Sequence, residues 1–520
     1  MRCHFAKLSN MKIRGALLTF FILLKFFLQY LAINPVYELH RDEYLHVDLG
    51  NHLAWGYTSV PPITGLISYL IIALGKSVFW VKFFPALFGV LTLVVVWKII
   101  EELKGNLFAL SLGAIGVICS ALLRINTLYQ PNSLEYLLWT LVFYYVIVYI
   151  NREQVKWIWL VAFTFAFGFL NKYNIAFLML GFFPALLFTE HKRVLLERHF
   201  YYAFGVAFLL VLPNLFWQFQ NDFPVLRHMK ILSETQLVNV DRFAFIKAQF
   251  LFFIGSIITL IAAVIGLMRY QPFKKYRIVL YTFSFVLLIY IYFKAKSYYS
   301  IGLYPVLLAF GSVYLEAVLK DGWKFYLRPV LLAIPVLIII PLFNLIVPAL
   351  APHQIVENPE LFKKLGLLRW EDGQEYQLPQ DFADMLGWSE LGILVDQAFE
   401  KIEDKNNTLI QCDNYGEAGA VNFYSSQKHS EALAINADYL YWYPLDRMEI
   451  KNVILIQDPQ DDDPNRERER EFFETVEFIG EIKNKFARER GARVYLLKGA
   501  KVSINKILEE EIEKEKACLN

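Results

Sequence analysis

The sequence is poor in charge and in cysteine, and each shortage excludes a class of protein. Only 19% of its 520 residues are charged, against roughly 25% in soluble domains, so an ordinary soluble protein is excluded. A net charge of +2 is too small to predict a nucleic-acid partner. The four cysteines, at positions 3, 119, 412 and 518, show no metal-ligand spacing, although a Cys412–Cys518 disulfide outside the membrane stays open.

A signal-peptide cleavage site, internal repeats and low-complexity tracts are also missing. The basic N-terminus leads into a long apolar run without a small-residue cleavage motif, so we expect a retained first span. What the chain does have is apolar and aromatic residues: 56% are hydrophobic, with 45 Phe, 30 Tyr and 11 Trp. This aromatic content suits membrane interfaces.

Apolar runs long enough to cross a bilayer predict about eleven transmembrane helices. They lie near 14–33, 79–97, 107–123, 133–150, 157–171, 174–189, 200–217, 248–268, 278–294, 300–319 and 329–349. Residues 157–189 would make one helix of about 50 Å, too long for a bilayer, so two short spans meeting at Lys172 are favoured. Lys25 lies inside the first span without an explanation from the sequence.

The connecting loops differ in their content of Lys and Arg, and this difference predicts the orientation. The side that includes Lys98, Arg152, Arg193 and Arg277 is richer in basic residues, so the positive-inside rule assigns it to the cytoplasm. An odd number of spans then places the C-terminal segment outside the cell membrane. The apolar stretch 61–75, which begins with two prolines, is too short to span and is expected to lie at or re-enter the outer face.

From about residue 352 the chain becomes soluble in character. Short apolar runs at 408–413, 452–458 and 492–498 predict buried strands, and helical patterns near 416–425 and 502–516 alternate with them. The charged run 461–471 predicts a solvated loop and helix face. The predicted fold is therefore a mainly α polytopic membrane domain over 1–350, with an exterior loop at 34–78, and a soluble α/β domain over 351–520.

The first exterior loop carries the best candidates for chemistry. Asp42 and Glu43 are adjacent carboxylates near a membrane surface, where they cost desolvation unless they are hydrated, paired or used. A carboxylate there can accept the proton of an acceptor hydroxyl, which is general-base catalysis. A hydrated loop with incidental charges is the alternative. His40, His46 and His52 recur every six residues, a poor match to one helical face, so no three-histidine metal site is predicted.

Further candidates lie where other predicted spans meet the exterior. Asn132 and Glu135 follow a proline at the start of one span, where helix capping alone also explains them. Lys172 and Lys296 are cations suited to a lipid-linked phosphate, with snorkelling as the alternative. The remaining candidates are aromatic or amide residues that suit carbohydrate contact or ordinary interfacial anchoring: Tyr173, Trp217, Gln218, Tyr298 and Tyr299.

These segments, in this order, resemble bacterial members of the GT-C glycosyltransferase superfamily. The most similar group is the dolichyl-phosphate-mannose protein mannosyltransferase-like one, which includes the aminoarabinose lipid A transferases. The matching pieces are HRDEYLHVDLGNHLAWGY, PPITGLI, QPNSLEYLLW, GFLNKYN, LPNLFWQFQNDFPVL, KSYYSIGLYPVLLAFG and DNYGEAGAVNFY. The resemblance covers roughly residues 15–450, and the combination is specific although no single piece is.

The resemblance implies inverting transfer of a sugar from a polyprenyl-phosphate donor to an extracytoplasmic acceptor, in a bacterial inner membrane with the C-terminal domain in the periplasm. It makes Asp42 the base or acceptor-orienting group, Glu43 its partner and Lys172 a contact of the donor phosphate. His52 joins the substrate-binding candidates. Many relatives carry aspartate at the position of Asn132, which leaves open whether Glu135 takes over its role. Some members use a divalent metal and others do not, so no cofactor is assigned and a divalent metal stays open.

A transporter or flippase for lipid-linked sugars is the main alternative, and a scaffold protein is a third. Transporters often show paired repeats with polar residues near mid-membrane. Here the ionisable residues gather in exterior loops, and no glycine-rich nucleotide-binding loop stands at a strand-to-helix junction. Both features favour an enzyme that uses a lipid-linked donor.

Overall fold

The computed structural model describes residues 2–235, 237, 240–427 and 429–518. The chain forms two compact units. The first contains the N-terminal segment to Ala32, Val60–Ile63 and Lys82–Val347. The second contains Ile33–Ser59, Thr64–Val81 and the chain from Pro348 onward. The first exterior loop, except for Val60–Ile63, therefore belongs to the same compact unit as the C-terminal segment, although about 270 residues of sequence separate them.

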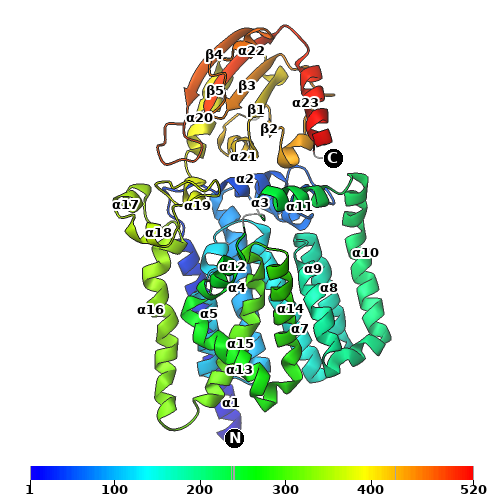
Figure 1. The fold of residues 1–520 in the computed structure, drawn as a ribbon, viewed down its shortest axis with the longest axis vertical. Helices are drawn as coiled ribbons and strands as arrows, with labels where there is room; N and C mark the ends of the chain where they lie inside the picture. The colour runs from blue at the N-terminus through cyan, green and yellow to red at the C-terminus, as the bar shows by residue number, and fades with distance from the viewer. Residues whose placement is uncertain (1, 236, 238–239, 428, 519–520) are drawn as a thin grey trace. The chain divides into compact units, whose positions relative to one another are not determined.

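The first unit is helical, and Figure 1 shows its long helices running side by side. Its helices are α1 (Arg2–Leu31), α4 (Val78–Glu102), α5 (Leu107–Ile118), α6 (Leu122–Ile125), α7 (Pro131–Arg152), α8 (Val155–Asn171), α9 (Ile175–Leu187), α10 (Arg198–Gln220), α11 (Pro224–Thr235), α12 (Arg242–Leu251), α13 (Ile257–Arg269), α14 (Arg277–Tyr292), α15 (Tyr304–Val318) and α16 (Arg328–Ile346). The short 3₁₀ helix η5 (Ser297–Leu303) precedes α15. The predicted mainly α membrane domain is confirmed.

The count of about eleven spans is not confirmed. Within the described residues, six helices are long and apolar enough to cross a membrane, or up to eight if each of two bent pairs is one span. The bends measure 107° after α9 and 68° after α12, and three further apolar helices, including α5 and α8, are shorter than a full span. The apolar runs of the sequence do form helices, but bends and short lengths decide which of them pass as complete spans.

The break predicted within 157–189 is present at Lys172. Helix α8 ends at Asn171, Lys172 is extended, and α9 begins at Ile175. The buried Asn171 amide donates to the carbonyl of Pro131 over 3.0 Å, which fixes the end of α8 beside the start of α7. The structure also places Lys25. Its ammonium is fully buried and donates to Gln29 Oε1 over 3.1 Å, so this cation faces the protein interior rather than lipid.

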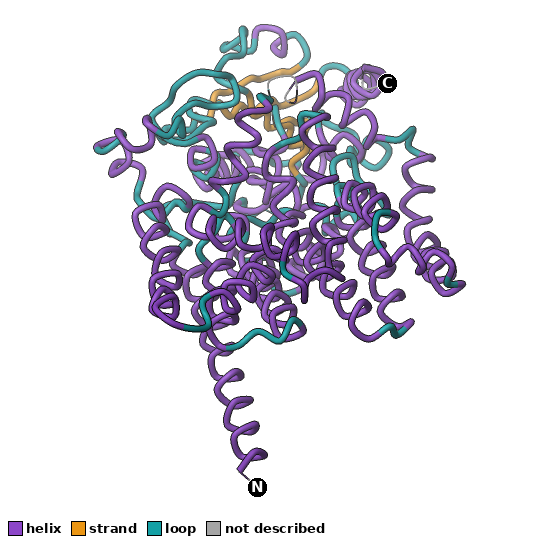
Figure 2. Tube along the Cα trace, turned by 60° about the horizontal axis from the view of Figure 1, so that its bottom comes forward, coloured by secondary structure: helices purple, strands orange, loops and turns teal. Residues whose placement is uncertain are grey.

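The second unit contains a five-stranded sheet in the order β2-β1-β3-β5-β4. The strands are β1 (Thr408–Cys412), β2 (Ala432–Ala434), β3 (Asn452–Gln457), β4 (Phe473–Glu481) and β5 (Arg493–Ala500). Strands β2 and β3 run parallel to β1 on its two sides, and β5 runs antiparallel to β3 and β4. Figure 2 shows the strands in orange. The predicted α/β character of this segment is confirmed, while β2 and the edge strand β4 were not predicted.

This unit also contains helices, of which the first two lie in the first exterior loop. The helices are α2 (Arg41–Asp48), α3 (Ile63–Ala73), α17 (Pro352–Glu357), α18 (Glu360–Lys364), α19 (Gln380–Ala383), α20 (Trp388–Glu400), α21 (Tyr415–Tyr424), α22 (Glu467–Arg470) and α23 (Ile504–Cys518). Helix α21 lies between α20 and α2 and contacts both. At Gly419, in α21, an added Cβ would come within 2.6 Å of Tyr44 Cβ, so glycine permits this close packing.

The charged run 461–471 is only partly solvated, which corrects the prediction for it. Arg466 is buried, with ion pairs to Asp461 and, over 3.2 Å, to Glu469. The Cys412 thiol is buried and free rather than disulfide-bonded. The side chain of Cys518 lies outside the described residues.

Candidate functional site

Asp42 lies in the first turn of α2, and the residues around it determine where this helix begins. His40 Nδ1 accepts a hydrogen bond from the Asp42 amide over 3.2 Å, and Glu43 Oε2 accepts one from the His40 amide over 2.8 Å. The two bonds form a capping box, which satisfies amides that a helix start otherwise leaves unpaired. Glu43 is fully buried in this role, so the structure gives it a helix-capping task beside the predicted chemical one.

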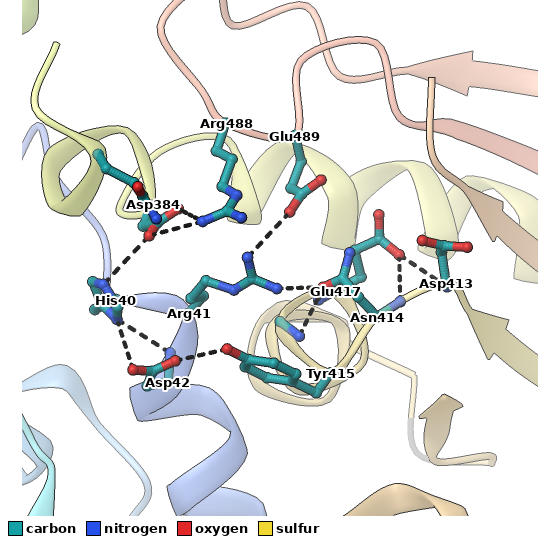
Figure 3. Close-up of polar contacts among 12 residues, drawn as sticks. His40, Arg41, Asp42, Asp384, Asp413, Asn414, Tyr415, Glu417, Arg488 and Glu489 are labelled. Atoms are coloured by element: carbon teal, nitrogen blue, oxygen red, sulfur yellow. Dashed lines mark hydrogen bonds and ion pairs between the residues drawn. The ribbon is translucent and has the colours of Figure 1, made fainter. Parts of the chain in front are cut away.

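The Asp42 carboxylate is held ionised. Its Oδ1 accepts a hydrogen bond from the Tyr415 hydroxyl over 2.9 Å (Figure 3). About a third of the Asp42 side chain is exposed to solvent. Burial acts to raise the pKa of Asp42, but the imidazoles of His40 and His46, the Tyr415 hydroxyl and the Arg41 guanidinium hold it below its ordinary value. This carboxylate therefore stays charged and accessible at neutral pH.

Arg41 joins the Asp42 region to the C-terminal segment. Its Nη2 donates to Asn414 Oδ1 over 3.3 Å, and its Nη1 lies 4.0 Å from Glu489 Oε1. The guanidinium also lies 4.6 Å from the centre of the Tyr415 ring. Arg41 thus orients both the ring that donates to Asp42 and the start of α21.

A second pair of charges lies beside His40. Its Nε2 is 3.6 Å from Asp384 Oδ2, and Arg488 Nη1 donates to Asp384 Oδ1 over 3.1 Å. Burial raises the pKa of Asp384, against the opposing charges of His40, Arg488 and Arg41.

Two other polar residues of the exterior loop, Asp48 and His52, make their contacts within the same unit. Asp48 is fully buried, and its Oδ2 accepts hydrogen bonds of 2.7 Å from Asn422 and from Tyr439. Its Oδ1 lies 3.5 Å from Lys76 Nζ. The His52 ring stacks on Trp442 at 4.0 Å, and its Nε2 lies 2.9 Å from Glu431 Oε1. The structure therefore gives His52 contacts within the second unit.

The first unit holds a separate polar cluster around Lys172. The Lys172 ammonium donates to Asn132 Oδ1 over 2.6 Å and lies 3.2 Å from Glu135 Oε2. It also sits over the rings of Tyr299, at 4.6 Å, and Tyr298, at 5.5 Å. The structure thus brings together five of the predicted residues, and it adds a counter-ion to the cation that was expected to face a phosphate.

The cluster continues through Asn174 and Tyr290, which the sequence did not single out, and the predicted residues Tyr173 and Gln218 are hydrogen-bonded to each other. Asn174 Nδ2 donates to Glu135, and the Tyr290 hydroxyl donates to Asn174 Oδ1 over 2.8 Å. Tyr173 donates to Asn214 over 3.2 Å and accepts from Gln218 Nε2 over 2.9 Å. Glu135 is almost fully buried, so this network replaces the water that its carboxylate would otherwise bind.

Trp217 and Lys296 are the remaining predicted residues of the first unit. Trp217 is half-buried on α10, one residue before Gln218. Lys296 is half-buried and close enough to His228 in α11 to act on it. Burial and the Lys296 charge lower the pKa of His228, so it stays neutral at physiological pH. Among the described residues, no group of three or more His, Cys, Asp or Glu side chains is arranged to hold a metal ion.

The comparisons with known proteins agree with this architecture. Residues 59–217 match the family model for dolichyl-phosphate-mannose-protein mannosyltransferase. The fold matches ArnT from Cupriavidus metallidurans bound to undecaprenyl phosphate, with 11% identity, a TM-score of 0.60, and coverage of 92% of this chain and 98% of that chain. Over residues 59–217 the chain is therefore similar to this mannosyltransferase family, and its overall fold is ArnT-like.

The fold also matches the archaeal oligosaccharyltransferase AglB from Archaeoglobus fulgidus, in complex with an inhibitory peptide and a dolichol-phosphate. That match has 10% identity and a TM-score of 0.50, and it covers 85% of this chain and 69% of that chain. A search of curated protein sequences found no match. The superfamily resemblance and the fold class predicted from the sequence are confirmed.

Sequence reasoning missed the residues that surround Asp42. Tyr415 and Asn414 stand in the segment DNYGEAGAVNFY, directly after a predicted strand, which was a usable signal because loops after parallel strands often carry function. Asp384, Arg488 and Glu489 gave no local signal, because only the tertiary structure brings them to Arg41 and His40.

Proposed function

We propose that this GT-C protein transfers a sugar from a polyprenyl-phosphate donor to an extracytoplasmic acceptor, with inversion at the anomeric carbon. The observation that carries the proposal is the Asp42 carboxylate, held by Tyr415 and a third exposed in the first exterior loop. The family match over 59–217 and the ArnT-like fold support the same reaction class. The structures of ArnT with undecaprenyl phosphate and AglB with a dolichol-phosphate support a lipid-linked donor.

In the proposed reaction, Asp42 orients the acceptor and takes its proton. The acceptor oxygen forms a bond to the anomeric carbon of the sugar, and the bond from that carbon to the phosphate oxygen breaks. The polyprenyl phosphate leaves with the electron pair, and the acceptor proton passes to the Asp42 carboxylate. A carboxylate with a lowered pKa stays ionised before transfer and accepts the proton late, as the new bond forms. Glu43 contributes by fixing the start of the helix that carries Asp42.

The Lys172 cluster is proposed to bind the donor. Lys172 supplies a cation for the phosphate, and Asn132 and Glu135 hold its ammonium in place. Because Glu135 is within 3.2 Å, the donor phosphate must compete with a carboxylate for this lysine. Tyr298 and Tyr299 offer ring faces beside the ammonium for a sugar, and Tyr173, Trp217, Gln218 and Lys296 are proposed to complete the donor-side surface.

We propose that the protein lies in a bacterial inner membrane with the second unit in the periplasm. A lipid-linked donor keeps its tail in the bilayer, so transfer takes place at the membrane surface. The greater density of basic residues on the opposite loops supports this orientation.

The decisive experiment is transfer of radiolabelled sugar from synthetic polyprenyl-phosphate donors by the purified protein, with Asp42→Asn measured beside wild type. We expect the variant to lose more than about a hundredfold in rate, as for other general-base positions. Inserted and folded Asp42→Asn protein with normal turnover would contradict the assignment. Movement of labelled lipid across liposomes without transfer would favour the flippase instead.

A further inference from the structure

A polar cleft lies within the second unit, at the carboxyl edge of the parallel strands. Its volume is about 580 Å³, and its lining includes Arg41, Asn414, Asp458 and Arg490. Asn414 follows β1, and Asp458 follows β3. From β1 the chain crosses to β2 on one side, and from β2 it returns to β3 on the other. Ligands of open α/β sheets bind at the point where the strand order reverses in this way.

The cleft adjoins the Asp42 site through the chain itself. Arg41 and Asn414 line it, and the residues that follow them, Asp42 and Tyr415, are hydrogen-bonded to each other. Figure 3 shows the Arg41 guanidinium between Asn414 and Glu489, which also lines the cleft. A molecule seated here therefore contacts the residues that hold the proposed base.

The acidic residues of the lining already accept hydrogen bonds or face a cation, whereas part of the basic lining has no acidic partner among the described residues. Asp372 accepts from the Tyr376 hydroxyl over 2.6 Å, and Asp458 accepts from the Gln460 amide over 2.7 Å. Glu489 faces Arg41. Lys485 and Arg490 are exposed lining residues for which the described part of the chain supplies no ion pair. The cleft is thus prepared for an anionic group, which arginine and lysine bind with charge-assisted hydrogen bonds.

An aromatic pair forms another part of the lining. The rings of Trp370 and Tyr376 stack at 3.7 Å with 18° between their planes. Trp370 Nε1 donates to the Leu378 carbonyl over 2.8 Å, and Gly373 makes the turn between the two residues with a φ of +81°. The pair is therefore held rigidly and presents apolar ring surface, against which the C–H face of a sugar packs.

We propose that this cleft is the acceptor site and that it binds a carbohydrate carrying an anionic group, of which a sugar phosphate is the simplest form. Lys485, Arg490 and Arg41 bind the anion, and Trp370 with Tyr376 binds the sugar ring. The volume of the cleft lies within the range of about 300–1,000 Å³ typical of small-molecule sites. The role as acceptor site rests on the proposed function, whereas the binding itself does not.

Calorimetry on the full-length protein in nanodiscs tests the site without turnover. The probes are N-acetylglucosamine 1-phosphate, N-acetylglucosamine, inorganic phosphate and a phosphoserine peptide. We expect the sugar phosphate to bind at least about tenfold more tightly than each of the others, because it alone uses both parts of the lining. The Lys485→Gln/Arg490→Gln variant should lose about tenfold for the sugar phosphate, and Trp370→Ala should remove its advantage over inorganic phosphate.

A matched control, Lys451→Gln/Arg447→Gln, removes two exposed cations of the same unit outside the cleft and should leave binding unchanged. Equal binding by inorganic phosphate, preference for the phosphopeptide, or an equal loss in the control would each overturn the proposal. Wild-type sugar transfer without binding of any probe would reject the cleft while keeping the proposed function. Probe binding that follows the variants, without transfer from any donor, would keep the site and reject the transferase.

Discussion

Replacing Tyr415 by phenylalanine removes the hydroxyl that donates to Asp42 over 2.9 Å while keeping the ring beneath Arg41. A hydrogen bond to a charged group contributes about 1.5–3 kcal/mol, and solvent screening of the partly exposed Asp42 reduces this contribution to about 1–2 kcal/mol. If this bond holds the carboxylate in the geometry for transfer, kcat/KM at neutral pH should fall roughly five- to thirtyfold.

The pH profile provides a second readout of the same change. The Tyr415 hydroxyl is one of the groups that lower the pKa of Asp42, so its removal raises that pKa. The ionised fraction of Asp42 then falls at a higher pH, and the acid limb of kcat/KM should move upward in Tyr415→Phe. A purely structural defect would lower the rate without moving the acid limb.

The assay is radiolabelled sugar transfer across a pH series with the purified protein. Tyr443→Phe is a matched control, because it removes a tyrosine hydroxyl of the same unit that donates to Gln411 over 2.6 Å. The control should keep both the rate and the acid limb. An unchanged acid limb and rate in Tyr415→Phe would refute the view that this hydroxyl holds the catalytic carboxylate.

Three further changes test the surroundings of the two clusters. Lys76→Met leaves the buried Asp48 without its cation and should cost about 2–3 kcal/mol in the free energy of unfolding of the second unit. Because burial raises the pKa of Asp48, the loss measured by thermal unfolding should be smaller at pH 5 than at pH 7.5. Equal losses at the two pH values would contradict this expectation. Lys172→Ala should raise the donor KM by at least about tenfold, and an unchanged KM in transfer kinetics would return Lys172 to an interfacial role. Gly419→Ala should cost about 1–3 kcal/mol through the contact with Tyr44, measured by thermal unfolding against Gly205→Ala, which has open space around it.

The apolar runs of the sequence, in a chain with 56% hydrophobic residues, determined the membrane helices. Inside a bilayer the backbone N–H and C=O groups must bond to each other, and a helix satisfies them within one segment. The break at Lys172 was also readable, since one helix across 157–189 exceeds the bilayer thickness. Strands β1, β3 and β5 followed from their apolar composition, whereas β2 has only three residues and β4 is an edge strand with polar positions. The number of complete spans did not follow, because bends after α9 and α12 depend on packing.

The sequence also determined which residue types stand in the exterior loop, and so it pointed to Asp42. Only the tertiary structure decided what each residue does there. It turned Glu43 inward as a helix cap, gave Lys172 a carboxylate partner, and brought Tyr415 to Asp42 across 373 positions of sequence. These contacts join segments far apart in the chain, and no local pattern records them, because a hydrogen bond depends on distance in space and not on separation in sequence.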